Sequence, residues 1–218
     1  MNSIELNDLL PAAFESERVS AAVIQSDVWL RHITLQRPGM YLVDAGSGRG
    51  KSSLCSYIHG DRTDYTGTIL IDGIDINSFT VERWCMLRRN ELAYLPQEMR
   101  LFPELTALEN VMLKNRLTDA LTQTEITAMA ERLEVDRVLN RPAGLLSIGQ
   151  QQRVAAIRAV SQPFDFIILD EPVSHLDRRN NRAMASLITD EAGRRGAAVI
   201  ITSVGNALSV DNCHTLRL

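Results

Sequence analysis

Residues 45 to 53 read Ala-Gly-Ser-Gly-Arg-Gly-Lys-Ser-Ser, a string whose residue types and spacing suit the binding of a phosphate chain. Gly48 and Gly50 permit turns that aim successive backbone N–H groups inward, so that they form a nest for an anion. A helix that starts near Lys51 adds the partial positive charge of its N-terminus. Lys51 is then expected to reach the β- and γ-phosphates of a nucleotide, and Ser52 to coordinate Mg²⁺. The residues predicted to bind the nucleotide here are Ala45, Gly46, Ser47, Gly48, Arg49, Gly50, Lys51, Ser52 and Ser53.

Two positions of this string are unusual. Ala45 stands where loops of this type begin with glycine. If the position needs a positive φ, alanine costs about 1 kcal/mol, and if φ is negative alanine costs nothing. Arg49 adds a charge within the loop. The alternative, a chance glycine-rich turn, is disfavoured by the Gly-Lys-Ser ending and by the apolar run just before the string.

A pair of carboxylates, Asp170 and Glu171, directly follows the apolar run Phe166–Leu169. A buried strand that ends in two carboxylates places them at the C-terminal edge of a parallel sheet, where such sheets bind ligands. Asp170 is suited to hold Mg²⁺, directly or through water, and Glu171 to orient and deprotonate an attacking water. Taken alone, the pair could equally be a solvated acidic loop. Together with the phosphate-binding string, it indicates nucleotide hydrolysis.

The elements that position these residues follow from hydrophobic patterning. Apolar runs without alternation, typical of parallel strands covered on both faces, occur at Met40–Val43, Phe166–Leu169 and Ala198–Ile201. Helical patterns lie between them, which predicts a doubly wound α/β core. Segments expected to form a small antiparallel sheet beside that core are Ile4–Leu6, Trp29–Leu35 and Thr68–Ile71.

The stretch from residue 104 to 145 reads as helices. Thr106 and Glu109 have the spacing of a capping box, and so do Thr122 and Glu125. Apolar side chains that recur at helical spacing, and are expected to pack on the chain's own domain, are Ile126, Met129, Ala130 and Leu133. We predict one domain over residues 1–218, with a helical subdomain at about 98–158 and no regulatory domain appended.

Composition excludes several classes of function. The net charge of the 218-residue chain is −4 and no block of Lys and Arg stands out, so no nucleic-acid surface is expected. The scattered cysteines Cys55, Cys85 and Cys213 are expected to be reduced, mostly buried thiols that bind no metal. No apolar run approaches the roughly 20 residues that a membrane span needs, and no signal-peptide pattern is present. We therefore expect a cytoplasmic location.

These residues and their order resemble the nucleotide-binding domain of the ATP-binding cassette (ABC) ATPases, over essentially the whole chain. Tyr94-Leu-Pro-Gln97 is similar to the family's Q-loop, which implies that Gln97 contacts Mg²⁺ and the attacking water. Asp170 and Glu171 take the Walker B and catalytic glutamate positions. The resemblance implies an α/β fold: a P-loop NTPase (RecA-like) core with a small antiparallel β subdomain and an inserted helical subdomain.

Two further strings resemble motifs that act between ABC subunits. Leu146-Ser-Ile-Gly-Gln-Gln-Gln-Arg153 is similar to the signature motif, with Ser147 as a natural helix N-cap. The resemblance implies that the nucleotide of the opposite subunit is contacted by Ser147, Gly149 and Gln150, so that ATP holds a dimer together. Ile148 replaces the first of two glycines and is expected to loosen dimer closure without abolishing it. Residues 174–177 resemble the D-loop, with Ser174 and Asp177 crossing to the other subunit.

Two family features are weak in this sequence. An aromatic residue of the N-terminal sheet normally stacks on adenine, and either Phe14 or Trp29 could do so; Phe14 is preferred. The family's switch histidine is replaced by Ser203, which we assign as catalytic together with Glu171 and Gln97. The histidines present offer no substitute by position, being expected in the D-loop (His175) or at surface and turn positions (His32, His59 and His214).

The resemblance implies the ATPase subunit of an ABC transporter, with ATP and Mg²⁺ as cofactors and with Ser52, Gln97 and Asp170 around the metal. It would form a homodimer, or a heterodimer with a second ABC ATPase, and drive transmembrane permease subunits from the inner face of the cytoplasmic membrane. Met99, Leu101 and Phe102 are expected to dock a helix of such a subunit or to pack within the domain. The segment 97–111 looks most like the lipoprotein-release and macrolide-export type.

Two alternatives remain at the level of the sequence. One is a non-transport ABC ATPase, although the chain has one cassette and no coiled-coil or zinc-bearing insert. The other is a nucleotide-binding regulatory module with little turnover, since Ala45, Ile148 and Ser203 all depart from the family pattern. Glu171 argues against complete loss of catalysis, so slow hydrolysis is expected.

Overall fold

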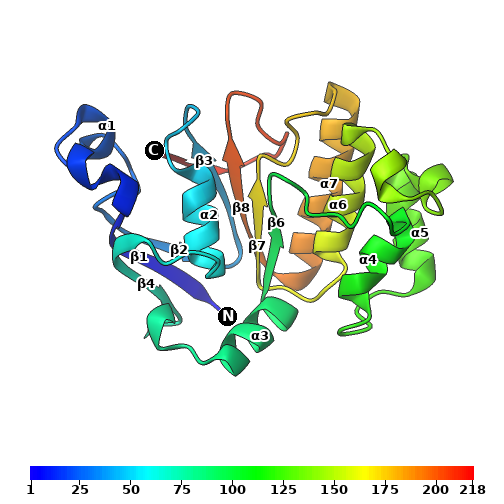
Figure 1. Ribbon diagram of the computed structural model, residues 1–218, viewed down its shortest axis with the longest axis horizontal. Helices are drawn as coiled ribbons and strands as arrows, with labels where there is room; N and C mark the ends of the chain where they lie inside the picture. The colour runs from blue at the N-terminus through cyan, green and yellow to red at the C-terminus, as the bar shows by residue number, and fades with distance from the viewer.

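The computed structural model describes residues 1–21 and 23–218. Its strands form a four-stranded antiparallel sheet, in the order β2-β1-β4-β5, and a five-stranded parallel sheet, in the order β6-β7-β8-β3-β9 (Figure 1). The strands are β1 (Ser3–Pro11), β2 (His32–Gln36), β3 (Gly39–Asp44), β4 (Tyr65–Ile71), β5 (Ile74–Asp75), β6 (Leu92–Leu95), β7 (Phe166–Asp170), β8 (Ala198–Ser203) and β9 (His214–Arg217).

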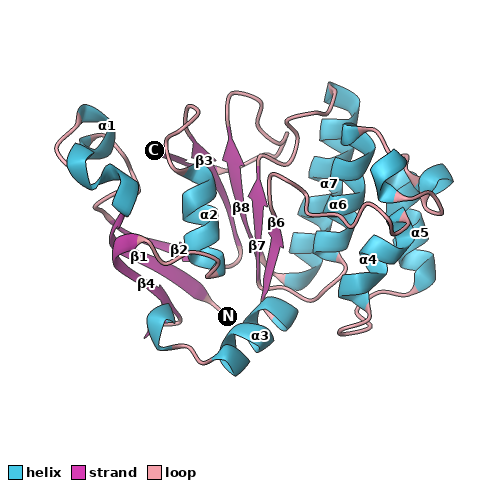
Figure 2. Ribbon diagram, in the orientation of Figure 1, coloured by secondary structure: helices cyan, strands magenta, loops and turns pink.

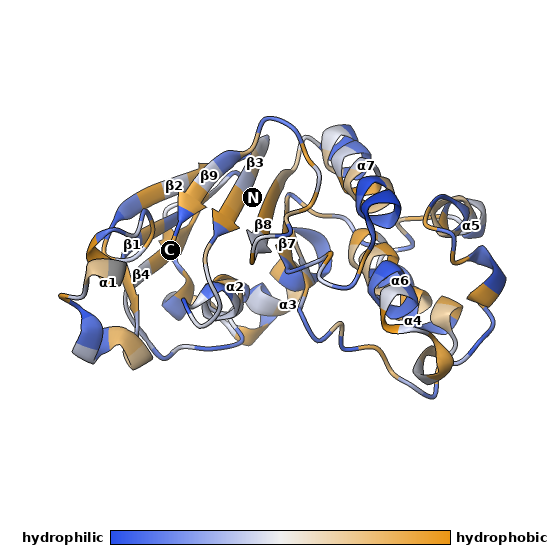
Figure 3. Ribbon diagram, turned by 90° about the horizontal axis from the view of Figure 1, so that it is seen from above, coloured by the Kyte–Doolittle hydropathy of each residue, from blue (hydrophilic) through white to orange (hydrophobic). Residues whose placement is uncertain are grey.

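Helices cover the parallel sheet from both sides (Figure 2). The α-helices are α1 (Ala21–Ile24), α2 (Lys51–His59), α3 (Val81–Asn90), α4 (Ala107–Asn115), α5 (Gln123–Arg132), α6 (Ile148–Val160) and α7 (Arg178–Arg195). Short 3₁₀ turns are η1 (Ala12–Glu17), η2 (Ile76–Ser78), η3 (Asp136–Val138) and η4 (Ala143–Leu145). Helix α2 lies on one side of the sheet, and α6 and α7 lie on the other (Figure 3).

The three predicted buried strands form neighbouring strands of the parallel sheet as β3, β7 and β8. Their side chains alternate between two cores. Phe166 and Ile168 pack with α2 and the antiparallel sheet, whereas Ile167 and Leu169 pack with α6 and α7. Because both faces of β7 are buried, its sequence shows an unbroken apolar run rather than alternation. The predicted α/β core is therefore present.

The antiparallel sheet contains the predicted segments Ile4–Leu6 and Thr68–Ile71, but the third prediction was too long. Strand β2 begins at His32, so Trp29 is not in a strand. The Ser26 hydroxyl accepts hydrogen bonds from the backbone N–H groups of Val28 and Trp29, at 3.0 and 2.8 Å, and this turns the chain before β2. The Trp29 side chain is buried in the core.

The helical subdomain begins after β6. Both predicted capping boxes are present, at Thr106 and Glu109 for α4 and at Thr122 and Glu125 for α5. The apolar stripe of α5 is buried against its own domain, as expected. Figure 3 shows α4, α5 and α6 on the side of the parallel sheet opposite the antiparallel sheet.

Two smaller predictions were wrong. Cys85 is exposed, because it lies on the outer face of α3, while Cys55 is buried. His59 is no simple surface residue: its ring lies 4.8 Å from that of Tyr94 and its Nδ1 lies 2.8 Å from Asp61 Oδ1. Burial lowers the pKa of His59. Among the described helices, none combines the length and the apolar character needed to cross a bilayer.

Candidate active site

The phosphate-binding string lies between β3 and α2, in the strand–loop–helix context that the sequence predicts. Gly48 and Gly50 have φ values of 75° and 90°, a left-handed conformation that glycine adopts readily. Gly50 is the N-cap of α2, so the first turn of that helix faces the loop. Ala45 is not among the described residues with positive φ, so alanine costs nothing there.

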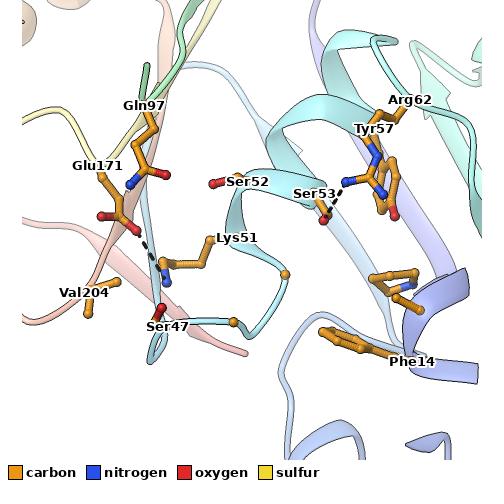
Figure 4. A pocket seen from close by; sticks show the side chains of 14 residues that line it. Phe14, Ser47, Lys51, Ser52, Ser53, Tyr57, Arg62, Gln97, Glu171 and Val204 are labelled. Carbon is orange, nitrogen blue, oxygen red and sulfur yellow. Dashed lines mark hydrogen bonds and ion pairs between the residues drawn. The ribbon is translucent and has the colours of Figure 1, made fainter. Parts of the chain in front are cut away.

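Lys51 is buried within this loop, with 4% of its side chain exposed. Its Nζ donates hydrogen bonds to the carbonyl oxygens of Ala45, at 3.0 Å, and Gly46, at 2.9 Å. The same Nζ lies 3.7 Å from Glu171 Oε1 (Figure 4). A buried cation thus meets a carboxylate from the end of β7, at the edge of the sheet where the loop opens.

The carboxylate of Asp170 and the backbone of Glu171 are both held by a residue that the sequence analysis missed. Thr202, fully buried in β8, donates its hydroxyl to Asp170 Oδ1 at 2.6 Å. The same hydroxyl oxygen accepts the backbone N–H of Glu171 at 3.1 Å. Thr202 is the register partner of Asp170 across the β7–β8 ladder, so the contact depends on strand pairing rather than on a local motif.

A cavity of about 550 Å³ opens over the phosphate-binding loop and Glu171 (Figure 4). That volume suits a nucleotide-sized ligand. Predicted residues that line it are Phe14, Ser47, Gly48, Gly50, Lys51, Ser52, Ser53, Gln97 and Glu171. Lining residues that the sequence did not suggest are Pro11, Ala13, Tyr57, Arg62 and Val204.

Arg62 is the most informative of the missed residues. Its Nη1 donates a 3.2 Å hydrogen bond to the Ser53 hydroxyl, and its guanidinium carbon lies 5.4 Å from the centre of the Tyr57 ring. Its Nε donates to Asp64 Oδ1 at 2.9 Å, which fixes the orientation of the guanidinium group. Arg62 therefore brings a second cation to the cavity, beside Ser53. It lies eleven positions after Lys51, outside any string that the sequence singled out.

The structure distinguishes between the two candidate aromatic residues. Phe14, in η1, lines the cavity, whereas only 2% of Trp29 is exposed. Trp29 packs edge-on against Phe14, with ring centres 6.3 Å apart, and its Nε1 donates to the carbonyl oxygen of Arg49 at 3.4 Å. Trp29 thus packs behind Phe14 and bonds to the phosphate-binding loop, so it helps to hold both in place. Arg49 itself lines a neighbouring cavity of about 300 Å³ rather than the main one.

Ser203 does not line the cavity. Its hydroxyl is buried and has no hydrogen-bond partner within the described part of the chain. The next residue, Val204, lines the cavity instead and is 42% exposed. Ser203 therefore does not line the cavity that Glu171 and Gln97 share, because β8 continues through Ser203 and keeps its side chain buried.

The signature residues lie at the start of α6, away from the cavity of their own chain. Ser147 is the N-cap and forms a capping box with Gln150, with hydrogen bonds of 3.3 and 3.0 Å. A side chain at Gly149 would lie 3.3 Å from the carbonyl oxygen of His175, so glycine permits α6 to approach the D-loop segment. Ile148 is 52% exposed. Asp177 caps α7 by accepting the Asn180 N–H at 2.8 Å.

An apolar groove of about 360 Å³ lies below the Q-loop segment. Exposed Phe102, Leu113 and Leu117 form its apolar part, while Arg100 and Lys114 add positive charge. Within the same groove, Arg158 of α6 donates to the carbonyl oxygens of Met99 and Arg100, the latter at 2.7 Å. Burial, with a smaller effect of Arg100, lowers the pKa of Arg158 to about 10.

Comparison with known proteins agrees with this arrangement. Residues 32–174 match the family model described as ABC transporter. The chain is 30% identical to the lipoprotein-releasing system ATP-binding protein LolD of Shewanella denitrificans, over 79% of this chain and 75% of that protein. It is also 30% identical to the thiamine import ATP-binding protein ThiQ of Escherichia coli K12, over 80% and 77% of the two chains.

Solved structures share the fold. The dimeric bacterial ABC transporter cassette MJ0796 superposes with a TM-score of 0.78 at 23% identity, covering 98% of this chain and 94% of that chain. A bacterial Atm1-family ABC exporter with ATP bound superposes with a TM-score of 0.71 at 22% identity, over 93% of this chain and 34% of that one. The predicted P-loop NTPase fold is confirmed.

The chain belongs to the ABC transporter family. It is an ATP-binding subunit of an ABC transporter and an ATPase, as the sequence predicts.

Proposed function

We propose that the 550 Å³ cavity binds MgATP and that Glu171 activates the water that attacks its γ-phosphate. The observation that carries this proposal is the convergence of Lys51 and Glu171, which come from different elements and lie 3.7 Å apart in one cavity. Phe14, at the other end, offers a ring face for adenine. The backbone N–H groups around Gly48 and Gly50, with Lys51, hold the phosphate oxygens.

Three side chains would suit a hard cation beside the phosphates: Ser52 and Gln97 line the cavity, and Asp170 is buried at the end of β7. Ser52, Gln97 and Asp170 offer a hydroxyl, an amide and a carboxylate oxygen, which is the donor chemistry that Mg²⁺ prefers. Mg²⁺ held there would neutralise negative charge on the phosphate oxygens. Glu171 then takes a proton from water, as a general base next to the metal site. Lys51 stabilises the negative charge on the transferred group.

A second cassette, either a copy of this chain or a related ABC ATPase, completes the site in our proposal. The start of α6, with Ser147 and Gly149, does not line the cavity of its own chain. Helix N-termini bind anions through unpaired N–H groups and the helix dipole. In the proposed dimer this end of α6 caps the γ-phosphate in the partner, and Ser174 and Asp177 cross the interface. ATP then closes the dimer, and hydrolysis opens it.

We assign the apolar groove to a short cytoplasmic helix of a transmembrane permease subunit, which holds this chain at the inner face of the cytoplasmic membrane. Exposed Phe102, Leu113 and Leu117 suit the apolar face of such a helix, and Arg100 and Lys114 suit its acidic residues. Arg158 links this groove to the backbone of Met99 and Arg100, two and three residues after Gln97, so a docked helix could shift the position of Gln97. The resemblance of the segment 97–111 to the lipoprotein-release and macrolide-export type stays a prediction.

Site-directed crosslinking tests the docking proposal. In a Cys85→Ser background, which removes the exposed native thiol, Phe102→Cys should crosslink to a permease subunit in membranes. The matched control is Val81→Cys, at a position on α3 that is 74% exposed, and it should not crosslink to the permease subunit. Equal capture from both positions, or none from Phe102, would count against the groove as the docking site.

A second candidate, a nucleotide-binding module with little turnover, is favoured by one observation. Val204, rather than a hydrogen-bond donor, lines the cavity next to Glu171. A steady-state ATPase assay of the assembled complex separates the two candidates. If the parent complex turns over no faster than the Glu171→Gln complex, the regulatory module is favoured. If the parent complex turns over clearly faster, the transport ATPase is favoured.

A further inference from the structure

The backbone of Glu171 is held in an uncommon conformation. Its φ is 49°, in the left-handed region that residues with a Cβ seldom occupy. Such a conformation persists only where surrounding contacts over-determine it, and it is often found at functional sites. Two buried side chains supply these contacts, one on each side of the residue.

Thr202 holds the N-terminal side. Its hydroxyl oxygen accepts the Glu171 N–H at 3.1 Å, while the hydroxyl proton is donated to Asp170 Oδ1 at 2.6 Å. One side chain therefore fixes both the backbone of Glu171 and the carboxylate of Asp170. Since Thr202 is fully buried in β8, the rigid parallel sheet sets its position.

Gln152 holds the C-terminal side. Its Nε2 donates to the carbonyl oxygen of Glu171 and to the Ser174 hydroxyl, both at 3.2 Å, and its Oε1 accepts the His175 N–H at 3.3 Å. All of these partners lie in the segment between β7 and α7. Gln152 belongs to α6, the helix whose N-terminus carries Ser147, and is 2% exposed.

We propose that Thr202 and Gln152 are positioning residues: they hold the backbone on either side of Glu171 and so orient its carboxylate into the cavity. Because Gln152 belongs to α6, the orientation of the Glu171 side chain depends on the position of that helix. The helix that presents Ser147 to the partner's nucleotide thereby adjusts the Glu171 of its own chain. The inference rests on the proposed role of Glu171 as the catalytic base.

Substitution of Thr202 tests the first contact. Thr202→Val keeps the shape and removes the hydroxyl, whereas Thr202→Ser keeps the hydroxyl. We expect Thr202→Val to lower kcat at least tenfold while the Kd for MgATP changes less than threefold, and Thr202→Ser to recover most of the loss. Thr215→Val, at an exposed position of β9 in the same sheet, is the matched control and should retain the parent kcat. A parallel loss in Thr202→Ser would overturn the positioning role.

Substitution of Gln152 tests the second contact. Gln152→Met keeps the length of the side chain and removes the two hydrogen bonds that Nε2 donates and the one that Oε1 accepts. We expect kcat to fall at least fivefold with little change in the Kd for MgATP. Gln162→Met is the matched control, because the Gln162 amide is also buried and donates to the carbonyl oxygens of Arg88 and Leu92, outside the 171–175 segment. Equal losses of kcat in both variants would overturn the assignment to Gln152.

Amide hydrogen exchange of the full chain separates this inference from the function it rests on. The Glu171 amide should exchange at least tenfold faster in Thr202→Val than in the parent, while the amides of Ile167 and Ile168 should not change. If the exchange rate of the Glu171 amide is unchanged in Thr202→Val, Thr202 does not hold the backbone of Glu171, whatever the kinetics show. If Glu171→Gln hydrolyses ATP at the parent rate, the base assignment and the kinetic role of the positioning residues both fail, while faster exchange at Glu171 still reports the contact itself.

Discussion

Lys51 Nζ and Glu171 Oε1 lie 3.7 Å apart, joining the start of α2 to the end of β7. The pair is largely buried, and a buried charge depends on its partner. When a triphosphate enters the cavity, its oxygens can accept the hydrogen bonds of the Lys51 ammonium group. The Glu171 carboxylate is then free to bind a water molecule. The same contact can therefore stabilise the open site and prepare the base.

Replacing Lys51 tests the phosphate loop. Lys51→Ala should weaken MgATP binding about 10- to 150-fold, since a hydrogen bond to a charged group contributes about 1.5–3 kcal/mol. Isothermal titration calorimetry measures the change. Lys51 and Lys114 are the two lysines of the chain, so Lys114→Ala, in the apolar groove, is a matched control that should retain affinity. Unchanged affinity in Lys51→Ala would refute the loop assignment.

Replacing the base should uncouple binding from hydrolysis. Glu171→Gln keeps the shape but removes the proton acceptor, so turnover should fall by about 10²–10⁴ while MgATP still binds. Size-exclusion chromatography with MgATP should show a dimer that persists over hours. Glu104→Gln, at an exposed position, should hydrolyse normally. Parent-like hydrolysis by Glu171→Gln would show that another group activates the water.

Phe14 should determine recognition of the base. Stacking of a base on an aromatic ring contributes about 1–3 kcal/mol, so Phe14→Ala should raise the Kd for ATP roughly 5- to 150-fold, and Phe14→Tyr should largely preserve it. Fluorescent-nucleotide titration provides the measurement, with Phe102→Ala in the apolar groove as the control. If Phe14→Ala binds like the parent, adenine stacks elsewhere.

Asp61 should make stability depend on pH. A hydrogen bond from His59, with help from Arg100, lowers the pKa of Asp61 to about 2 from its ordinary 3.8. A lowered folded-state pKa adds stability above about pH 4, and this stability is lost as pH falls through about 2. Allowing for solvent screening, Asp61→Asn should cost about 1 kcal/mol at pH 7. Denaturant unfolding should show the same difference from the parent at pH 7 and pH 5 and a smaller difference at pH 3. An unchanged difference at pH 3 would point to packing alone.

Much of this architecture could be predicted because its signals are local. The capping boxes at Thr106 and Thr122, the unbroken apolar run of β7 and the Gly-Lys-Ser string each depend on neighbours in the sequence. The chemistry at Lys51 and Glu171 follows from the same strings, because parallel strands bring their C-terminal ends to one edge.

The residues that were missed act across elements. Thr202 meets Asp170 only through the register of β7 and β8, and Gln152 meets Glu171 only through the packing of α6. Arg62 reaches the cavity because Asp64 and Tyr57 fix its guanidinium. No spacing rule within one segment reports such contacts. The end of β8 at Ser203 likewise determines which side chain lines the cavity, and the position of a strand end is predicted from sequence only to within about two to four residues.

The end of β8 also determines where a histidine could reach the cavity. By sequence the switch position falls on Ser203, but Ser203 is buried and Val204 lines the cavity. An imidazole at 203 would overpack the interior, so Ser203→His should destabilise the fold by about 1–3 kcal/mol and leave turnover low. Val204→His places a donor at the cavity wall, where one donor to transition-state charge contributes about 10²–10³ in rate.

We therefore expect turnover of Val204→His to exceed that of the parent tenfold or more, at unchanged Kd for MgATP. Val204→Leu, which keeps the wall apolar, is the matched control and should not gain. Steady-state ATPase assays and thermal unfolding of the three variants decide the matter together. The opposite outcome, faster hydrolysis in a well-folded Ser203→His and no gain in Val204→His, would mean that the strand end turns on nucleotide binding. Position 203 would then face the γ-phosphate, and the slow turnover expected of the parent would come from its serine.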